Sequence, residues 1–280
     1  MSNGSSFHRA AAALLLALAA SPVHTATDAR LAATLAETGL FEAGSVERIR
    51  GSNQAFAPQF PLWTDGQAKR RWLYLPPGAT IDKSDPDRWD FPRGTRLWKE
   101  FSAEGRIETR LIERLADGSW RFASYAWNAE GTEATLAPAE GIPKRGIPSR
   151  ADCLACHEGA NVPVLGYSAV QLGGMIAARS PQERAAMGYL HGNCGHCHNA
   201  NALEATGLFL AQSAASPVRS AAATRASVAE RAAEILRRVQ SANRYIRMPP
   251  IGVSVPDSQS AAVIEHWIQQ DLQPHREASR

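Results

Sequence analysis

The chain has 280 residues, and its 30 Lys and Arg against 27 Asp and Glu leave a formal net charge of only +3. So balanced a chain, without a run of basic residues, is not expected to bind nucleic acid electrostatically. The hydrophobic fraction of 44% is ordinary for a globular protein, and the length is sufficient for two modest domains.

The amino terminus has the pattern of a secretory leader. His8 and Arg9 precede an unbroken apolar run over residues 10–20. This run has signal-peptide length and is shorter than the roughly 20 residues that a membrane span requires. We expect residues 1–26 to be a cleaved signal peptide, with a membrane anchor as the alternative. The mature chain would then lie in the periplasm, without a transmembrane span.

The next two segments differ in character. Residues 27–55 carry apolar residues at helical spacing and are expected to form a helical connector. Residues 56–137 contain six of the seven tryptophans. Alternating, aromatic-rich runs predict strands over 71–75, 95–101, 106–115 and 120–127, with an Asp117-Gly118 hairpin between the last two. We expect a small antiparallel β domain, either a sandwich or a meander, with most of the aromatic rings in its core.

The remainder lacks strand alternation and is expected to be helix and loop. Residues 138–180 contain a Pro- and Gly-rich linker, and residues 181–274 contain three predicted helices. Ser180-Pro181 with Glu183 predicts the start of the first, and apolar spacing predicts the others over 229–239 and 258–272. The expected fold class is α+β, a small antiparallel β domain followed by an all-α domain.

The pattern Cys-x-x-Cys-His occurs twice and contains every cysteine of the chain. The first copy is Cys153-Leu-Ala-Cys156-His157, and the second is Cys194-Gly-His-Cys197-His198. This spacing is typical of c-type haem attachment, in which the thiols form thioethers and the adjacent imidazole is the proximal iron ligand. We therefore predict two covalently bound haem c groups, with His157 and His198 as axial ligands.

Other uses of paired cysteines are less consistent with this pattern. Two pairs could form a four-thiolate zinc site, but zinc ribbons separate their pairs by roughly 15–20 residues and need no histidine after each pair. A thioredoxin-like redox pair requires a βαβ context that neither motif shows. Simple disulfides between the pairs are a further alternative.

The segment around the second motif has the element order of a small cytochrome c. A helix precedes Cys194, a long loop and a middle helix follow, and a final helix ends the segment. Met248 in Arg247-Met-Pro-Pro250 is the predicted sixth ligand of this haem, because two prolines stiffen the loop that presents its sulfur. A thioether ligand raises the reduction potential of the iron.

The sixth ligand of the first haem is less determined. His191 lies three residues before Cys194 on the same helical face and is the leading candidate. His196, Met175 and Met187 are the alternatives. A five-coordinate iron is also possible on the sequence, and its open position would permit peroxide chemistry.

Several sequence blocks resemble those of a group of largely uncharacterised exported bacterial di-haem c-type cytochromes, over residues 38–272. These blocks are Phe60-Pro-Leu-Trp63-Thr-Asp-Gly66, Arg70-Arg-Trp-Leu-Tyr-Leu-Pro76, Gly94-Thr-Arg-Leu-Trp-Lys99, Ile147-Pro-Ser-Arg-Ala-Asp-Cys153, Val164-Leu-Gly166, Gln171-Leu172, Tyr189-Leu-His-Gly-Asn-Cys194 and Met248-Pro-Pro250. The resemblance implies a β module followed by haem-binding segments, and it favours His191 as a ligand. Some relatives occur beside or fused to sugar-dehydrogenase-like modules, which implies an electron carrier serving a periplasmic oxidoreductase.

Three functional hypotheses follow from the sequence. The first is one-electron transfer between periplasmic redox partners, possible with two haems and no evident catalytic constellation. The second is an enzyme, a di-haem peroxidase or oxidase with an open position on the first haem. The third is a binding module in which the β domain docks a dehydrogenase or a carbohydrate, and it is compatible with the first.

Overall fold

A computed structural model describes residues 31–201 and 207–272 of the chain, which belong to one compact unit. The predicted signal peptide and the first four residues of the predicted connector lie outside the described residues. None of the described helices is both long and apolar enough to cross a bilayer.

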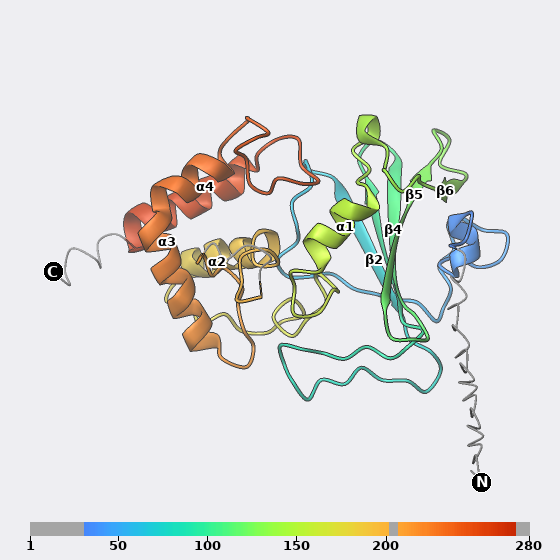
Figure 1. The fold of residues 1–280 in the computed structure, drawn as a ribbon, viewed down its shortest axis with the longest axis horizontal. Coiled ribbons are helices and arrows are strands. Elements are labelled where there is room, and N and C mark those ends of the chain that lie inside the picture. The colour runs from blue at the N-terminus through green and yellow to red at the C-terminus, as the bar shows by residue number, and fades with distance from the viewer. Residues whose placement is uncertain (1–30, 202–206, 273–280) are drawn as a thin grey trace, which may run out of the picture. The chain divides into compact units, whose positions relative to one another are not determined.

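The amino-terminal half is a single antiparallel sheet whose strands follow one another in chain order (Figure 1). Its strands are β1 (Gln54–Ala55), β2 (Ala68–Tyr74), β3 (Arg96–Ser102), β4 (Arg106–Arg114), β5 (Trp120–Trp127) and β6 (Ala134–Leu136). The four predicted strands correspond to β2 through β5, and the predicted hairpin joins β4 to β5. Of the two expected architectures, the sheet is the meander.

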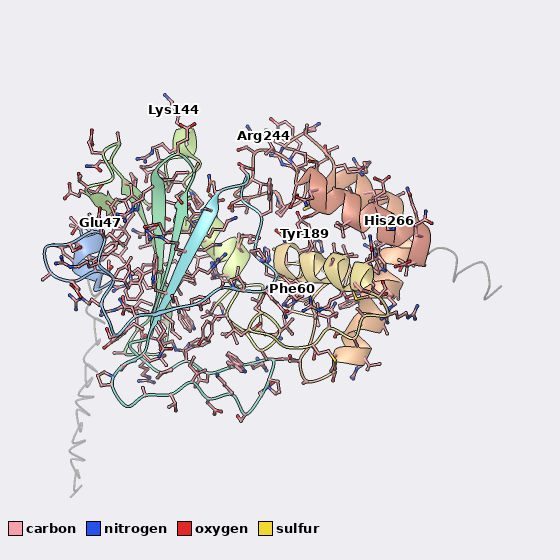
Figure 2. All side chains as sticks on the ribbon, turned by 180° about the vertical axis from the view of Figure 1, so that it is seen from behind. Glu47, Phe60, Lys144, Tyr189, Arg244 and His266 are labelled. Carbon is pink, nitrogen blue, oxygen red and sulfur yellow. The ribbon has the colours of Figure 1, made fainter. Side chains whose placement is uncertain are left out.

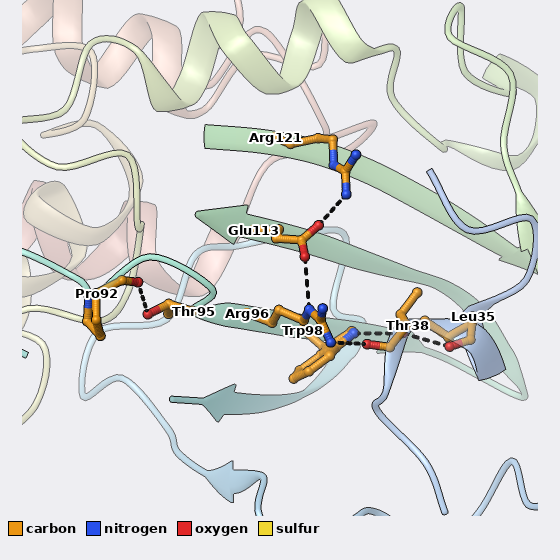
Figure 3. Close-up of polar contacts among 8 residues, drawn as sticks. All are labelled: Leu35, Thr38, Pro92, Thr95, Arg96, Trp98, Glu113 and Arg121. Atoms are coloured by element: carbon orange, nitrogen blue, oxygen red, sulfur yellow. Dashed lines mark hydrogen bonds and ion pairs between the residues drawn. The ribbon is translucent and has the colours of Figure 1, made fainter. Parts of the chain in front are cut away.

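One face of the sheet is covered by the segment before it. Trp98 and Trp127 are completely buried there against Leu35 and Phe41. The indole N–H of Trp98 donates to Thr38 Oγ1 at 3.0 Å (Figure 3). The aromatic rings of this face are therefore core residues, as alternation in the strands predicts.

The predicted helical connector is mostly not helical. Within its described part the structure has one four-residue 3₁₀ helix, Leu35–Thr38, before the short strand β1. Gly39 ends the 3₁₀ helix with a φ of 85°, a left-handed conformation that glycine adopts without strain. Packing of Leu35 and Leu40 on the sheet replaces the longer helix that apolar spacing suggested.

The carboxy-terminal half contains four α-helices in the described residues. They are α1 (Arg150–His157), α2 (Pro181–Asn193), α3 (Pro217–Val239) and α4 (Ser258–Trp267), the last continuing into a π-turn over Ile268–Leu272. α2 begins as predicted, because the Ser180 side chain accepts from the Glu183 N–H. The chain is therefore of mixed α+β class, with the sheet preceding the helices.

The helices share one apolar core. Met187 and Leu190 of α2 are fully buried in the same cluster as Ile264 and Trp267 of α4. Phe60, from the segment before β2, also belongs to this cluster, and Figure 2 shows it beside the helix that carries Tyr189. A Cβ on Gly188 would lie 2.1 Å from the Phe60 ring, so only glycine permits this approach.

Residues 59–65, which we call the strap, connect the sheet to the helical half. The backbone N–H of Phe60 donates to the Gln171 side chain at 3.1 Å. The Asp65 carboxylate accepts from the backbone N–H of Ser254, at 2.8 Å to Oδ1. The strap thus contacts both the loop after the first motif and the loop after Met248.

Candidate functional site

The first Cys-x-x-Cys-His motif lies on α1, which packs against β5 of the sheet. A capping box fixes the start of this helix, with Ser149 and Asp152 exchanging side-chain and backbone hydrogen bonds. Cys153, Cys156 and His157 line a cavity between α1 and the sheet, which Leu97 and Phe122 also line. The side chains predicted to hold the first haem therefore face one common space.

The orientation of His157 suits a metal ligand. Its Nδ1 lies 2.8 Å from the carbonyl oxygen of Pro163. Because a carbonyl only accepts, Nδ1 carries the proton and Nε2 keeps a free lone pair. Burial lowers the pKa of His157 to about 4, aided by the charges of Lys99 and Arg110, so the ring is neutral at pH 7. The ring also packs against Phe122, with centroids 4.8 Å apart.

The four thiols are chemically unlike a redox pair. All are free, so the structure contains no disulfide among them. Burial raises the pKa of Cys194 to about 12 and that of Cys156 to about 11. Catalytic Cys-x-x-Cys pairs instead have lowered thiol pKa values, because the thiolate is the reactive form. Neither the thioredoxin-like alternative nor the disulfide alternative finds support here.

The second motif begins where α2 ends. Cys194 is the residue that caps this helix, and its carbonyl accepts from the backbone N–H of His198 at 2.8 Å. Cys197 lines the same cavity as the cysteines of the first motif. Three of the four predicted attachment points therefore face one space, although 40 residues separate Cys156 from Cys197 in the sequence.

Asn199 joins the two motifs. Its Nδ2 donates to the carbonyl oxygen of Gly159, just after the first motif, at 2.8 Å. The same amide group donates to the carbonyls of Gly195 and His196 in the second motif, at 2.8 and 3.0 Å. A Cβ on Gly159 would lie 2.7 Å from the His196 carbonyl oxygen, which shows how closely the two backbones pack.

Met248 lies in a loop that is tied on both sides. The buried Arg247 donates to the carbonyls of Ala242 and Val253, at 3.1 and 2.9 Å. Met248 is half-buried, and Pro249 and Pro250 after it line the cavity of the first motif. The predicted sixth ligand of the second haem is thus held in an ordered loop at the edge of this cavity.

The candidates for the sixth ligand of the first haem differ in their surroundings. His191 Nδ1 accepts from the backbone N–H of Gln212 at 3.0 Å, which places the ring proton on Nε2 and leaves that atom without a lone pair for iron. Met175 is 69% exposed, and Met187 is enclosed in the helical core. His196 lines the cavity of the first motif. These contacts favour His196 over His191, whose ligation stays a prediction.

A second cavity of about 450 Å³ adjoins the first, which measures about 130 Å³. His191 lines only the larger cavity, whereas His196 and Gly192 line both. Ligand pockets usually measure about 300–1,000 Å³, so a macrocycle in the smaller cavity requires its walls to part. The Thr64 hydroxyl in that wall is buried without a hydrogen-bond partner among the described residues, which fits a site that receives a polar ligand.

A directly coordinated metal ion finds no comparable support. The described residues contain no group of three or more His, Cys, Asp or Glu side chains arranged to hold one. The four-thiolate zinc alternative therefore does not match the placement of the cysteines. The donor set does fit covalent haem, since neutral thiols, a neutral imidazole with a free Nε2 and apolar walls such as Phe122 and Leu97 meet in one place.

Three features of this site were not foreseen from the sequence. Pro163 acts through its backbone carbonyl, and Asn199 acts through hydrogen bonds from its side chain to backbone carbonyls. Neither residue belongs to a recognisable sequence motif. The third is a row of basic residues on the cavity side of the sheet, which depends on strand register. Comparisons with known proteins add nothing to the site, because no family model, no curated protein and no solved structure matches the chain.

Proposed function

We propose that this protein is an exported di-haem c-type cytochrome that transfers single electrons between periplasmic redox partners. One observation carries the proposal above all others. Both thiols and the histidine of the first motif line a single cavity, which Cys197 of the second motif also lines, and His157 has its Nε2 free. Nothing in zinc binding or thiol redox chemistry requires that combination.

Each side chain has a defined part in the proposal. Haem supplies an iron that alternates between ferric and ferrous states. The cysteines would tether it, and His157 and His198 would be its histidine ligands. The Pro163 carbonyl holds the His157 ring by its Nδ1–H, which fixes its orientation and raises its basicity. Met248 would be a ligand of the second haem, and a thioether ligand would raise its reduction potential.

The helical half supports a cytochrome c-like arrangement around the second motif. α2 ends at Cys194, and its Leu190 packs in one core with Ile264 and Trp267 of the final helix.

The alternative function is an enzyme that uses the first haem. The 450 Å³ cavity that adjoins the cavity of the first motif favours it, because a small ligand could approach from there. His196 lies in the wall that both cavities share. If His196 occupies the sixth position, that approach is blocked and the protein is an electron carrier.

The test is to express the full chain in a host that attaches c-type haem and to measure haem per chain. We expect two haems that survive a denaturing gel. Joint replacement of Cys153 and Cys156 by Ala removes one of them, and replacement of Cys194 and Cys197 removes the other. Colourless or zinc-containing protein contradicts the proposal. A persistent high-spin signal with peroxide turnover supports the enzyme instead.

A further inference from the structure

A row of basic residues crosses the cavity face of the sheet. Arg71 on β2 is the register partner of Lys99 on β3, and Lys99 is the partner of Arg110 on β4. Ser124 on β5 completes the row opposite Arg110. Directly opposed like charges destabilise an antiparallel sheet, so three cations in succession need an explanation.

Only one of the three charges of this row, that of Arg110, is balanced by an ion pair among the described residues. Arg110 pairs with Glu108, at 3.0 Å between Nε and Oε1. Arg71 is only 7% exposed, and its side chain forms no hydrogen bond or ion pair with any described residue. Lys99 likewise forms no ion pair with a carboxylate among the described residues, and its ammonium lies 4.8 Å from the centre of the Phe101 ring. Two buried or partly buried cations are therefore left over.

All three cations face the cavity that contains the first motif. Of the described residues lining it, Asp152 is the only acid, and its carboxylate is occupied by the Ser149 hydroxyl and N–H. Burying unpaired cations is costly, so this surface is suited to an anion.

We propose that the row formed by Arg71, Lys99 and Arg110 binds the two propionates of the first haem. This inference rests on the proposed function. Two carboxylates match the two uncompensated charges, and the fork of the Arg71 guanidinium suits bidentate binding of a carboxylate. The row lies on the same cavity as Cys153 and His157, which would hold the other parts of the macrocycle.

The test compares the midpoint potential of the first haem in the two-haem wild type, R71Q and K99Q. A nearby cation disfavours the ferric state, because that state has the greater positive charge. We expect each variant to shift the reduction equilibrium toward ferric by about tenfold, which is a fall of about 59 mV for one electron. The exposed Lys83 is the matched control, and K83Q should keep the wild-type potential.

The pH dependence provides a second readout that a merely structural role does not give. Propionates held by cations stay ionised between about pH 5 and 8, so the wild-type potential should be flat there. In R71Q the potential should fall with rising pH as a freed propionate titrates. The pH dependence of the wild type is informative by itself, so the test remains valid if a variant does not fold. K99R keeps the positive charge and should therefore retain the wild-type potential.

The outcomes separate this inference from the proposed function. Wild-type protein without haem overturns both. Protein with two haems whose first potential slopes with pH in the wild type, or is unchanged in R71Q and K99Q, overturns the propionate assignment alone. A flat wild-type potential together with lowered potentials in both variants supports it.

Discussion

The backbone N–H of Trp63 donates a 2.6 Å hydrogen bond to Oδ1 of Asn193, the residue immediately before Cys194. The side-chain amide of Asn193 also donates through its Nδ2 to the Tyr189 carbonyl at 3.0 Å. Asn193 is only 1% exposed, so neither bond is easily replaced by water. This single side chain therefore connects the strap to the helix that presents the second motif.

Replacing Asn193 by Ala should destabilise the fold. It leaves the Trp63 N–H without its acceptor, and an unsatisfied buried group costs about 1–3 kcal/mol. We expect the free energy of unfolding in urea to fall by about that amount. The control is Q270A at an exposed position, which should change it little. Equal stabilities of N193A and the wild type would show that the strap contact contributes nothing.

Replacing Met248 by Leu tests the second haem. Leucine keeps the apolar volume but lacks the sulfur that binds iron, so the variant should gain a high-spin ferric signal from one haem per chain. The midpoint potential of that haem should also fall. Electron paramagnetic resonance with a reductive titration measures both. The exposed Met175 is the control, and M175L should leave both readouts at wild-type values.

The parts of the fold that follow from local pattern are predictable from the sequence. Alternation in β4 and β5 and the Ser180-Pro181 cap of α2 are local signals, and the structure has those elements where they are expected. α1 is not predicted by apolar spacing, because a short helix of mostly Cys, Ala and charged residues has no strong apolar stripe. The Ser149-x-x-Asp152 capping pattern could have revealed it. α3 starts at Pro217, twelve residues before its predicted start, although Ser216-Pro217 repeats the signal used for α2.

The candidate site was only partly predictable. The motif spacing identifies the cysteines and both proximal histidines, because covalent haem attachment requires the two cysteines and the histidine to lie close together in the sequence. The row of Arg71, Lys99 and Arg110 is different, since its residues come together only through the register of three strands. Register is set by pairing over the whole sheet. A slip of one residue would turn every side chain of a strand to the opposite face. No local pattern in the chain contains that information.

Replacing each of the two candidate histidines by alanine in turn tests which of them is the sixth ligand of the first haem. We expect H196A to convert one haem to a high-spin, ligand-accessible state, because His196 lines the cavity of the first motif. H191A should stay low-spin, since the His191 Nδ1 already accepts from the Gln212 N–H. Optical spectra with and without added imidazole or cyanide measure the difference. The reverse pattern would establish His191 as the ligand, in line with the prediction from the sequence.

The Glu183–Arg225 ion pair between α2 and α3 should make the fold sensitive to acid. Its oxygen and nitrogen lie 2.7 Å apart, and both side chains are largely buried. Burial raises the pKa of Glu183, but hydrogen bonds from Arg225 and the Arg179 N–H outweigh it and lower the pKa below its ordinary value. A carboxylate with a lowered pKa stabilises the fold above the unfolded-state pKa of about 4.3, and that stability is lost as pH falls through the native pKa.

E183Q removes the charge and leaves the Arg225 guanidinium without its counter-ion, so it should lower the free energy of unfolding at pH 7 by about 1–3 kcal/mol. Below about pH 4 the gap between wild type and E183Q should close, because the wild-type carboxyl then protonates. Urea unfolding followed by circular dichroism at several pH values measures the gap. E234Q provides the comparison, because Glu234 pairs with Arg237 and Arg238 on an exposed helix face, where water and salt screen the charges and little stability depends on them. A gap for E183Q that stays constant down to pH 3 would show that the contribution of Glu183 is packing rather than charge.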